Sequence, residues 1–344
     1  MKGNRGLIYG IIGLISLGFV SIANLNLGSV PIPLSDTLKI LFQGSTASTE
    51  YTWEYIILNY RLPKVIVALL VGSGLGLSGL FMQTLFQNPM AGPYVLGLSS
   101  GASLGVALLI MGGGALGIST GNLLSSHWGL PIAASVGSLM VMLAIVAAAF
   151  RLKNTMKLLI VGIMFAALTG SVVTVLSYFS SSELLQRFVF WTFGSLGNLS
   201  SVDLKVLLLF WIMGIGIGLF CLKNLNALLL GEKYAQSMGV NVIRNRWLVI
   251  VATSFITGSI TAFVGPIAFV GLAVPHLVRS FIPTSNHFIL VPNVMVYGAL
   301  LMVVCDSIAQ LPGSQHILPI NAVTSLFGAP VVIWLLLRKR KLNF

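Results

Sequence analysis

The chain has 344 residues, of which 56% are hydrophobic and only 8% are charged. Ordinary soluble domains carry about a quarter charged residues, and the mean hydropathy here is +0.99. These values exclude a soluble globular domain and predict an all-α, polytopic membrane protein. The net charge of +12 does not indicate binding to nucleic acid, because the cations lie in short clusters between apolar runs and no nucleic-acid-binding motif is present.

Ten apolar runs follow one another along the chain, and we expect about ten transmembrane helices in one domain, residues 1–344. The runs cover about 7–23, 62–85, 93–111, 129–150, 157–179, 203–222, 247–264, 267–282, 289–308 and 320–337. The first run is similar to a signal peptide, but it is long and has no clear cleavage site, so we expect a span there. Between the first two runs, Ser35 is expected to cap a short amphipathic helix through Phe42.

The distribution of lysine and arginine predicts the orientation in the membrane. If the N-terminus is cytoplasmic, fourteen of the 19 lysines and arginines fall in cytoplasmic segments and five fall in outer segments. Cytoplasmic segments carry the excess of positive charge, so we expect both termini in the cytoplasm. Cys221 and Cys305 belong to different runs and are interpreted as packing residues, and no metal-ligand spacing is present.

Glycines at intervals of four mark one face of the second and third spans. Gly72 and Gly76 lie in the second span, and Gly97, Gly101 and Gly105 lie in the third. Stripes without side chains allow membrane helices to approach closely. We therefore expect both spans to pack tightly.

Two proline-containing breaks follow spans of opposite direction. Asn88 and Pro89 come after the second span, and Gly265 and Pro266 come after the seventh. Paired interruptions of this kind are expected from an inverted repeat, here of spans 2–5 and 7–10, although the two halves are too dissimilar in sequence to establish one. Gln83 and Asn88 either face a pathway or satisfy backbone groups of the first break.

The segment 223–246 is the longest that we place in the cytoplasm. Its core, LLLGEKYAQSMGVNV, predicts two short helices joined at Gly231 and Gly239. The segment is either a simple connector at the membrane surface or a docking site for a cytoplasmic partner. The residues alone leave both possibilities open.

Five segments in a fixed order carry a resemblance to a known family. They are RLPK (61–64), GLSGLFMQTLFQNPMAGPYVLGLSSGASLG (76–105), LGEKYAQSMGV (230–240), GPIAFVGLAVPHLVR (265–279) and P-x-x-A-V-T-x-x-x-G-A-P (319–330). Together they resemble the FecCD-type permease subunits of ABC importers for iron siderophores, heme and vitamin B12. The resemblance extends from about Leu34 to Leu337.

The resemblance implies a permease in the cytoplasmic membrane of a bacterium, surrounded by membrane lipid. Two permease chains, here most simply a homodimer, would enclose one pathway that opens alternately to either side. Two ATP-binding subunits would drive it, and a periplasmic or lipid-anchored binding protein would deliver an iron chelate, most simply a ferric siderophore. Heme and cobalamin are the alternative cargoes, and an ion-coupled secondary transporter is a remote alternative. This chain has no P-loop, so ATP and Mg²⁺ would belong to the partner, and no enzyme activity or cofactor is expected in it.

The resemblance also assigns roles to individual residues at the two faces. In the 223–246 segment, the family's coupling helices correspond to Leu230, Gly231, Glu232, Ala235 and Gly239. The small face at Ala235 and Gly239 would fit a groove of the ATP-binding subunit, and Glu232 would orient the helix. At the inner end of the pathway, Asn154 and Thr155 would form a gate, with helix capping as the competing interpretation.

On the outer face, Arg61 and Lys64 would dock the binding protein, unless they are simple interfacial anchors. The family usually has D-x-x-x-R after the ninth span, whereas here Asp306 is followed by Gln310, so docking would be looser or would use Arg187 or Lys205. We expect Asp306 to lie close enough to the interface to be solvated. Together with Asp306, the residues Pro275, His276 and Arg279 are interpreted as a structural motif.

Overall fold

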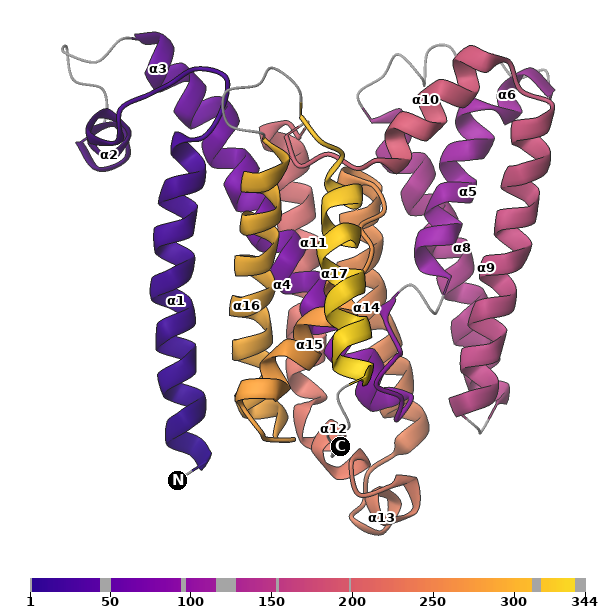
Figure 1. Cartoon of the computed structure of the whole chain (residues 1–344). Helices are drawn as coiled ribbons and strands as arrows, with labels where there is room; N and C mark the ends of the chain where they lie inside the picture. The colour runs from indigo at the N-terminus through magenta and orange to yellow at the C-terminus, as the bar shows by residue number, and fades with distance from the viewer. Residues whose placement is uncertain are drawn as a thin grey trace.

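A computed structural model describes residues 2–43, 51–93, 97–115, 128–152, 155–197, 199–310 and 317–337. Within these ranges, every regular element is a helix, and most of the long helices run side by side as a bundle (Figure 1). The fold class predicted from composition is therefore confirmed.

Among the residues that the structure describes, seven helical segments are long and apolar enough to cross a membrane. They lie in α1 (Lys2–Asn26), α4 (Leu62–Leu85, with the preceding turns), α8 (Gly129–Arg151), α9 (Thr155–Tyr178), α11 (Ser201–Phe220), α14 (Val242–Val264) and α16 (His287–Ala309). The other three predicted spans contain shorter helices, α5 (Leu98–Ile110), α15 (Val270–Phe281) and α17 (Ile320–Leu337). The helix α15 is short because residues 267–269, the first of the predicted span, lie in a backbone break.

Short helices lie at both ends of the bundle. At one end are α2 (Leu34–Gln43), α3 (Tyr51–Ile56), the π-helical turn η1 (Ile57–Arg61), α6 (Gly112–Ala115) and α10 (Ser182–Thr192). At the opposite end are α12 (Leu222–Leu228) and α13 (Glu232–Ser237). Figure 1 shows that α1 begins, and α17 ends, at the end of the bundle that carries α12 and α13.

Polar side chains fix the first turns of three long helices. Ser200 forms a capping box with Asp203 at the start of α11, and its Oγ accepts from the Asp203 N–H at 3.2 Å. Asn241 and Asn286 cap α14 and α16 in a similar way. These contacts satisfy backbone donors that have no partner inside the helix.

The centre of the bundle is α4, whose membrane-spanning window is 89% buried. Its glycines allow this burial, because a Cβ at Gly72 would overlap the Gly298 carbonyl of α16 and a Cβ at Gly79 would overlap the Gly271 carbonyl of α15. Gly76 lies against the Val294 carbonyl. The predicted close packing of this span is confirmed.

The second glycine stripe pairs α5 with α8. A Cβ at Gly101 would approach the Gly137 carbonyl to 2.6 Å, and a Cβ at Gly105 would overlap the Ala133 carbonyl. Two backbones therefore meet with almost no side chain between them. Together with α9, they form a group to one side of α4 (Figure 1).

The two breaks share one construction. In each, a long helix ends, and the short helix that comes next starts after a left-handed residue, Gly97 before α5 and Phe269 before α15, with φ of 72° and 65°. The long helices, α4 and α14, run in opposite directions (Figure 1). This local correspondence is what the inverted-repeat hypothesis expects, while the repeat of whole halves stays a hypothesis.

We expect Gly79→Ala to destabilise the protein, because its methyl group has no space against the α15 backbone. Overpacking of this kind costs about 1–3 kcal/mol. The measurement is the thermal unfolding of the detergent-solubilised chain. Gly170→Ala in α9 is the matched control, since nothing lies within 4 Å of its added Cβ. Equal melting temperatures for the two variants would contradict the packing described for α4.

Candidate functional site

The 223–246 segment folds as predicted into two short helices, α12 and α13. Gly231 joins them with φ of 102°, and Gly239 follows α13 with φ of 83°. Positive φ values are costly for residues with a side chain, which explains glycine at both joints. The last residues of the segment, from Val242 onward, already belong to α14.

The exposed face of this segment differs from the predicted one. Ala235 is fully buried against the body of the chain, so it does not present a small surface to a partner as expected. Gly239, the other residue of the predicted small face, is exposed, and so are the large apolar side chains of Leu230, Tyr234 and Met238, with exposed fractions of 64%, 55% and 59%. Tyr234 and Met238 are four apart along α13 and its C-cap, so they lie on one helical face, and Leu230 precedes the helix across the non-helical Gly231. We call these three residues the α13 stripe.

Neutral hydrogen bonds connect α12 to the ends of two spans. His287, the first residue of α16, contacts Asn226 of α12 through Nδ1 at 2.7 Å and Thr84 of α4 through Nε2 at 2.8 Å. The Asn226 Oδ1 also accepts from the His287 N–H. The ring of His287 is buried, so it holds α12 against the ends of α4 and α16.

Two further contacts connect the segment to its surroundings. Gln87, just after α4, donates through Nε2 to the Leu228 carbonyl at 3.0 Å. Glu232, at the start of α13, forms an ion pair of 3.0 Å with Arg246 of α14. Glu232 therefore bonds to its own chain, and its negative charge also suits a helix N-terminus. The role of Arg246 could not be predicted from the sequence, because nothing nearby distinguishes it from any other cation close to the membrane surface.

The first break is held by α15. His276 donates through Nε2 to the Pro89 carbonyl at 2.7 Å, and Arg279 donates to Gln83 Oε1 at the same distance. Asn88 accepts from the Met90 N–H at 2.9 Å. Gln83 and Asn88 thus have partners within the protein, and Gln83 is fully buried. The positions of His276 and Arg279 agree with a structural motif, in which Pro275 lies inside the helix.

The second break, at Gly265 and Pro266, is held by Asn321 in the first turn of α17. The Asn321 Oδ1 accepts from the Ala268 N–H at 3.1 Å, and its backbone N–H donates to the Phe193 carbonyl. The role of Asn321 was not expected from the sequence. The one feature that could have indicated it is its position as a polar residue inside the motif at 319–330.

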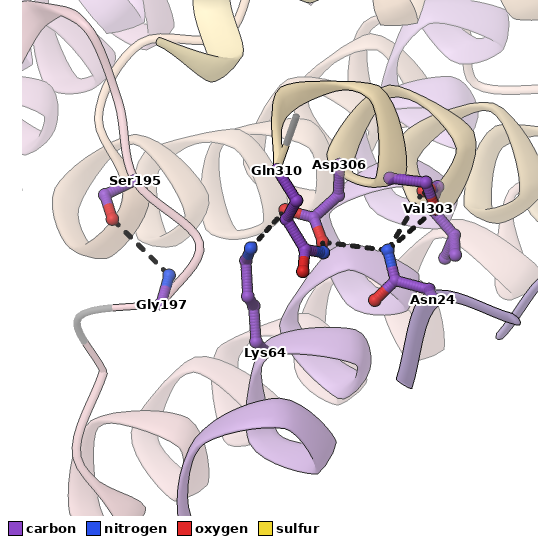
Figure 2. A network of polar contacts seen from close by, with 8 residues as sticks. Asn24, Lys64, Ser195, Gly197, Val303, Asp306 and Gln310 are labelled. Atoms are coloured by element: carbon purple, nitrogen blue, oxygen red, sulfur yellow. Dashed lines mark hydrogen bonds and ion pairs between the residues drawn. The ribbon is translucent and has the colours of Figure 1, made fainter. Parts of the chain in front are cut away.

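Asp306 is the centre of a polar network at the other end of the bundle (Figure 2). Its Oδ1 lies 2.9 Å from Lys64 Nζ of α4, and its Oδ2 accepts from Asn24 of α1 and from Gln310. Its side chain is only 3% exposed. The expectation that Asp306 is solvated is therefore wrong, because three helical segments close around it. Gln310 fits here because Lys64 already neutralises the carboxylate.

Both predicted docking cations are used inside the chain. Lys64 pairs with Asp306, and its side chain is 17% exposed. Arg61 donates to the Leu25 carbonyl at the end of α1 and to the Val30 carbonyl beyond it, at 2.8 and 2.5 Å. These contacts give both cations a structural role in joining α1, α4 and α16. A docking role stays a prediction.

The proposed inner gate falls largely outside the described residues. Asn154 is not among them, and Thr155 is described only as the first residue of α9. Its assignment stays a prediction.

Comparison with known proteins gives one consistent result. A model described as the FecCD transport family matches residues 15–338. The hemin transport system permease protein HmuU of Yersinia pestis is 35% identical over 333 residues, covering 95% of each chain. The vitamin B12 import system permease protein BtuC of Klebsiella pneumoniae is 36% identical, covering 83% of this chain and 84% of its own.

A solved structure shows the same fold. It is an inward-facing conformation of a metal-chelate-type ABC transporter, with a TM-score of 0.81 and 29% sequence identity. The match covers 95% of this chain and 98% of the other. The two chains therefore share the same arrangement of helices over nearly their whole length.

We expect Asp306→Leu to destabilise the chain by about 3–5 kcal/mol, because it leaves the charge of Lys64 buried without its partner. The double variant Lys64→Met with Asp306→Leu removes both charges and is expected to recover most of the loss. Unfolding of the purified chain is the measurement. Arg187→Gln, which breaks the exposed Glu183–Arg187 pair, is the control, with an effect below about 1 kcal/mol. A stable single variant would contradict the network.

Proposed function

Because the chain belongs to the FecCD transport family, we propose that it is the permease that moves an iron chelate, most simply a ferric siderophore, into a bacterium. Family members are permease subunits of importers in the bacterial inner membrane, and they work with a separate ATPase and a substrate-binding partner. The proposal adds the cargo, the sidedness and the identity of the coupling segment.

The observation that carries the proposal is the attachment of the 223–246 segment. It presents the α13 stripe outward, while Asn226, Leu228 and Glu232 bond to the spans. A connector without function needs neither an exposed apolar stripe nor buried polar contacts on its inner side. In the proposal, the ATP-binding partner seats on the α13 stripe and moves the spans through these contacts.

Sidedness follows from the positive-inside distribution, which puts α12, α13 and both termini in the cytoplasm. A second copy of this chain would complete the pathway. The spanning window of α9 is only 22% buried, and α17 exposes Leu326, Phe327 and Trp334, which leaves apolar surface for a partner helix. A homodimer is therefore proposed, with lipid around it.

The cargo is proposed from chemistry and from the relatives. A chelate brings its own ligands for the metal, so the permease needs an apolar passage and no resident cofactor. The relatives are a hemin and a vitamin B12 permease, and heme and cobalamin are therefore the alternative cargoes. ATP and Mg²⁺ would be bound by the partner.

We expect Tyr234→Asp to abolish ATP-driven uptake while the chain still folds, because Tyr234 is exposed and its exchange leaves the core intact. Loss of a central tyrosine typically weakens an interface by about 2 kcal/mol or more, roughly 30-fold. Co-purification with the ATP-binding subunit and uptake into proteoliposomes are the measurements.

The matched control is Phe42→Asp in α2, an aromatic residue that is even more exposed than Tyr234 and lies at the opposite end of the bundle. It should leave association with the ATP-binding subunit unchanged. Normal association and uptake by Tyr234→Asp would contradict the assignment of α13 as the coupling helix.

Uptake assays with a panel of candidate cargoes test which substrate the permease carries. We expect proteoliposomes that contain the permease, its ATP-binding subunit and its binding protein to accumulate a ferric siderophore when ATP is present. A preference for heme or cobalamin would overturn the siderophore as the proposed cargo, but it would leave the proposal of an ATP-driven importer intact. Uptake driven by an ion gradient, without any ATP-binding subunit, would contradict the proposed mechanism.

A further inference from the structure

Arg246 joins two elements that are distant in the sequence. Its guanidinium donates through one terminal nitrogen to Glu232 Oε1 of α13 at 3.0 Å. The other terminal nitrogen donates to the Leu152 carbonyl at 2.8 Å, 94 residues earlier in the chain. The Arg246 side chain is 2% exposed and that of Glu232 is 34% exposed. The contact is thus a buried bridge with one end near the surface.

The Leu152 carbonyl lies at the point where α8 ends. Leu152 is the C-cap of α8, and its ψ of 111° takes the chain out of the helix. Carbonyl groups in the last turn of a helix have no partner within it. Arg246 supplies that partner, and its positive charge is favourable at a helix C-terminus.

Arginine is suited to this position because its guanidinium presents several N–H groups in a rigid plane. Two nitrogens can therefore bond to two elements at a fixed separation. Lysine would retain the positive charge, but its single ammonium lacks this planar geometry. The bridge requires arginine geometry as well as charge.

The bridge complements the attachment of α12. Asn226 and Gln87 connect the segment to α4 and α16, whereas Glu232 and Arg246 connect it to α14 and to the end of α8. The helix α8 packs backbone to backbone on α5 through Gly101 and Gly137. Movement of the end of α8 is therefore passed to the group formed by α5, α8 and α9.

We propose that Arg246 is a positioning residue for transport, which makes the end of α8 move together with α13. The inference rests on the proposed function, because it assumes that a partner displaces α13. Without the bridge, displacement of α13 would still reach α4 and α16 through polar contacts, but it would reach the α5–α8–α9 group only through side-chain packing such as that of Gly258 of α14 beside Ser138 of α8, which does not fix the end of α8 to α13. ATP hydrolysis would then continue without productive opening of the pathway.

The first test is the ratio of cargo imported to ATP hydrolysed in proteoliposomes. Arg246→Lys is expected to lower this ratio by about tenfold or more, as misplacement of a positioning element does, while the complex still assembles. The double variant Glu232→Arg with Arg246→Glu restores an ion pair, but a glutamate cannot donate to the Leu152 carbonyl. The ratio should therefore stay low. Recovery in the double variant would show that the ion pair alone matters and would overturn the bridge.

The second test needs no partner protein. Spin labels at Arg151→Cys and Gln236→Cys, both exposed positions, report the separation between the end of α8 and α13 in the purified permease. We expect one narrow distance distribution, which Arg246→Lys broadens. Arg244→Lys, the same exchange at an exposed arginine of the same helix, is the control and should change neither the distances nor the ratio.

The outcomes separate the two hypotheses. If the wild-type chain binds no ATP-binding subunit, the proposed function fails, whereas the label distances still test the bridge. If the complex assembles and Arg246→Lys retains both a narrow distance distribution and the normal ratio, the inference is wrong.

Discussion

A membrane helix that breaks within the bilayer releases backbone N–H and C=O groups, and only the protein itself can bond to them there. Two such breaks lie beside the central bundle, after α4 and after α14. The first is closed by His276, which bonds to the Pro89 carbonyl, and the second by Asn321, which bonds to the Ala268 N–H. Each break therefore depends on a helix that comes later in the chain.

These contacts also explain how a short surface segment can influence the spans. The end of α4 contacts both α15, through Gln83 and Arg279, and α12, through Thr84 and His287. The 223–246 segment, the end of α4 and the first break are thus joined by polar contacts. A displacement of α12 and α13 by the proposed ATP-binding partner would therefore reach the first break.

Much of this arrangement could be predicted from local sequence. Hydropathy predicted the positions of the spans, and glycines at intervals of four predicted that α4 and α5 pack closely, although not which helices they pack against. Proline together with asparagine or glycine marked both breaks. The two short helices of the 223–246 segment were predicted because Gly231 and Gly239 interrupt strong helix formers.

Partners far apart in the sequence could not be predicted in this way. Asp306 lies near the end of a span, and nothing local shows that Asn24, 282 residues away, covers it. Ala235 was expected on the outer face of α13, but the direction in which α13 packs is decided by contacts with other helices. Arg246 and Asn321 each act on a carbonyl or amide from another helix. Such pairings depend on tertiary packing, which one sequence does not reveal.

The most direct measurement is the accessibility of α13 from each side of the membrane. Cys221 and Cys305 are buried, so a single exposed cysteine at Ser237→Cys can be labelled against a low background. The account predicts that a membrane-impermeant maleimide reacts with it only in inside-out vesicles, and that the ATP-binding subunit protects it. Labelling in right-side-out vesicles, or labelling that the bound subunit leaves unchanged, would contradict the account.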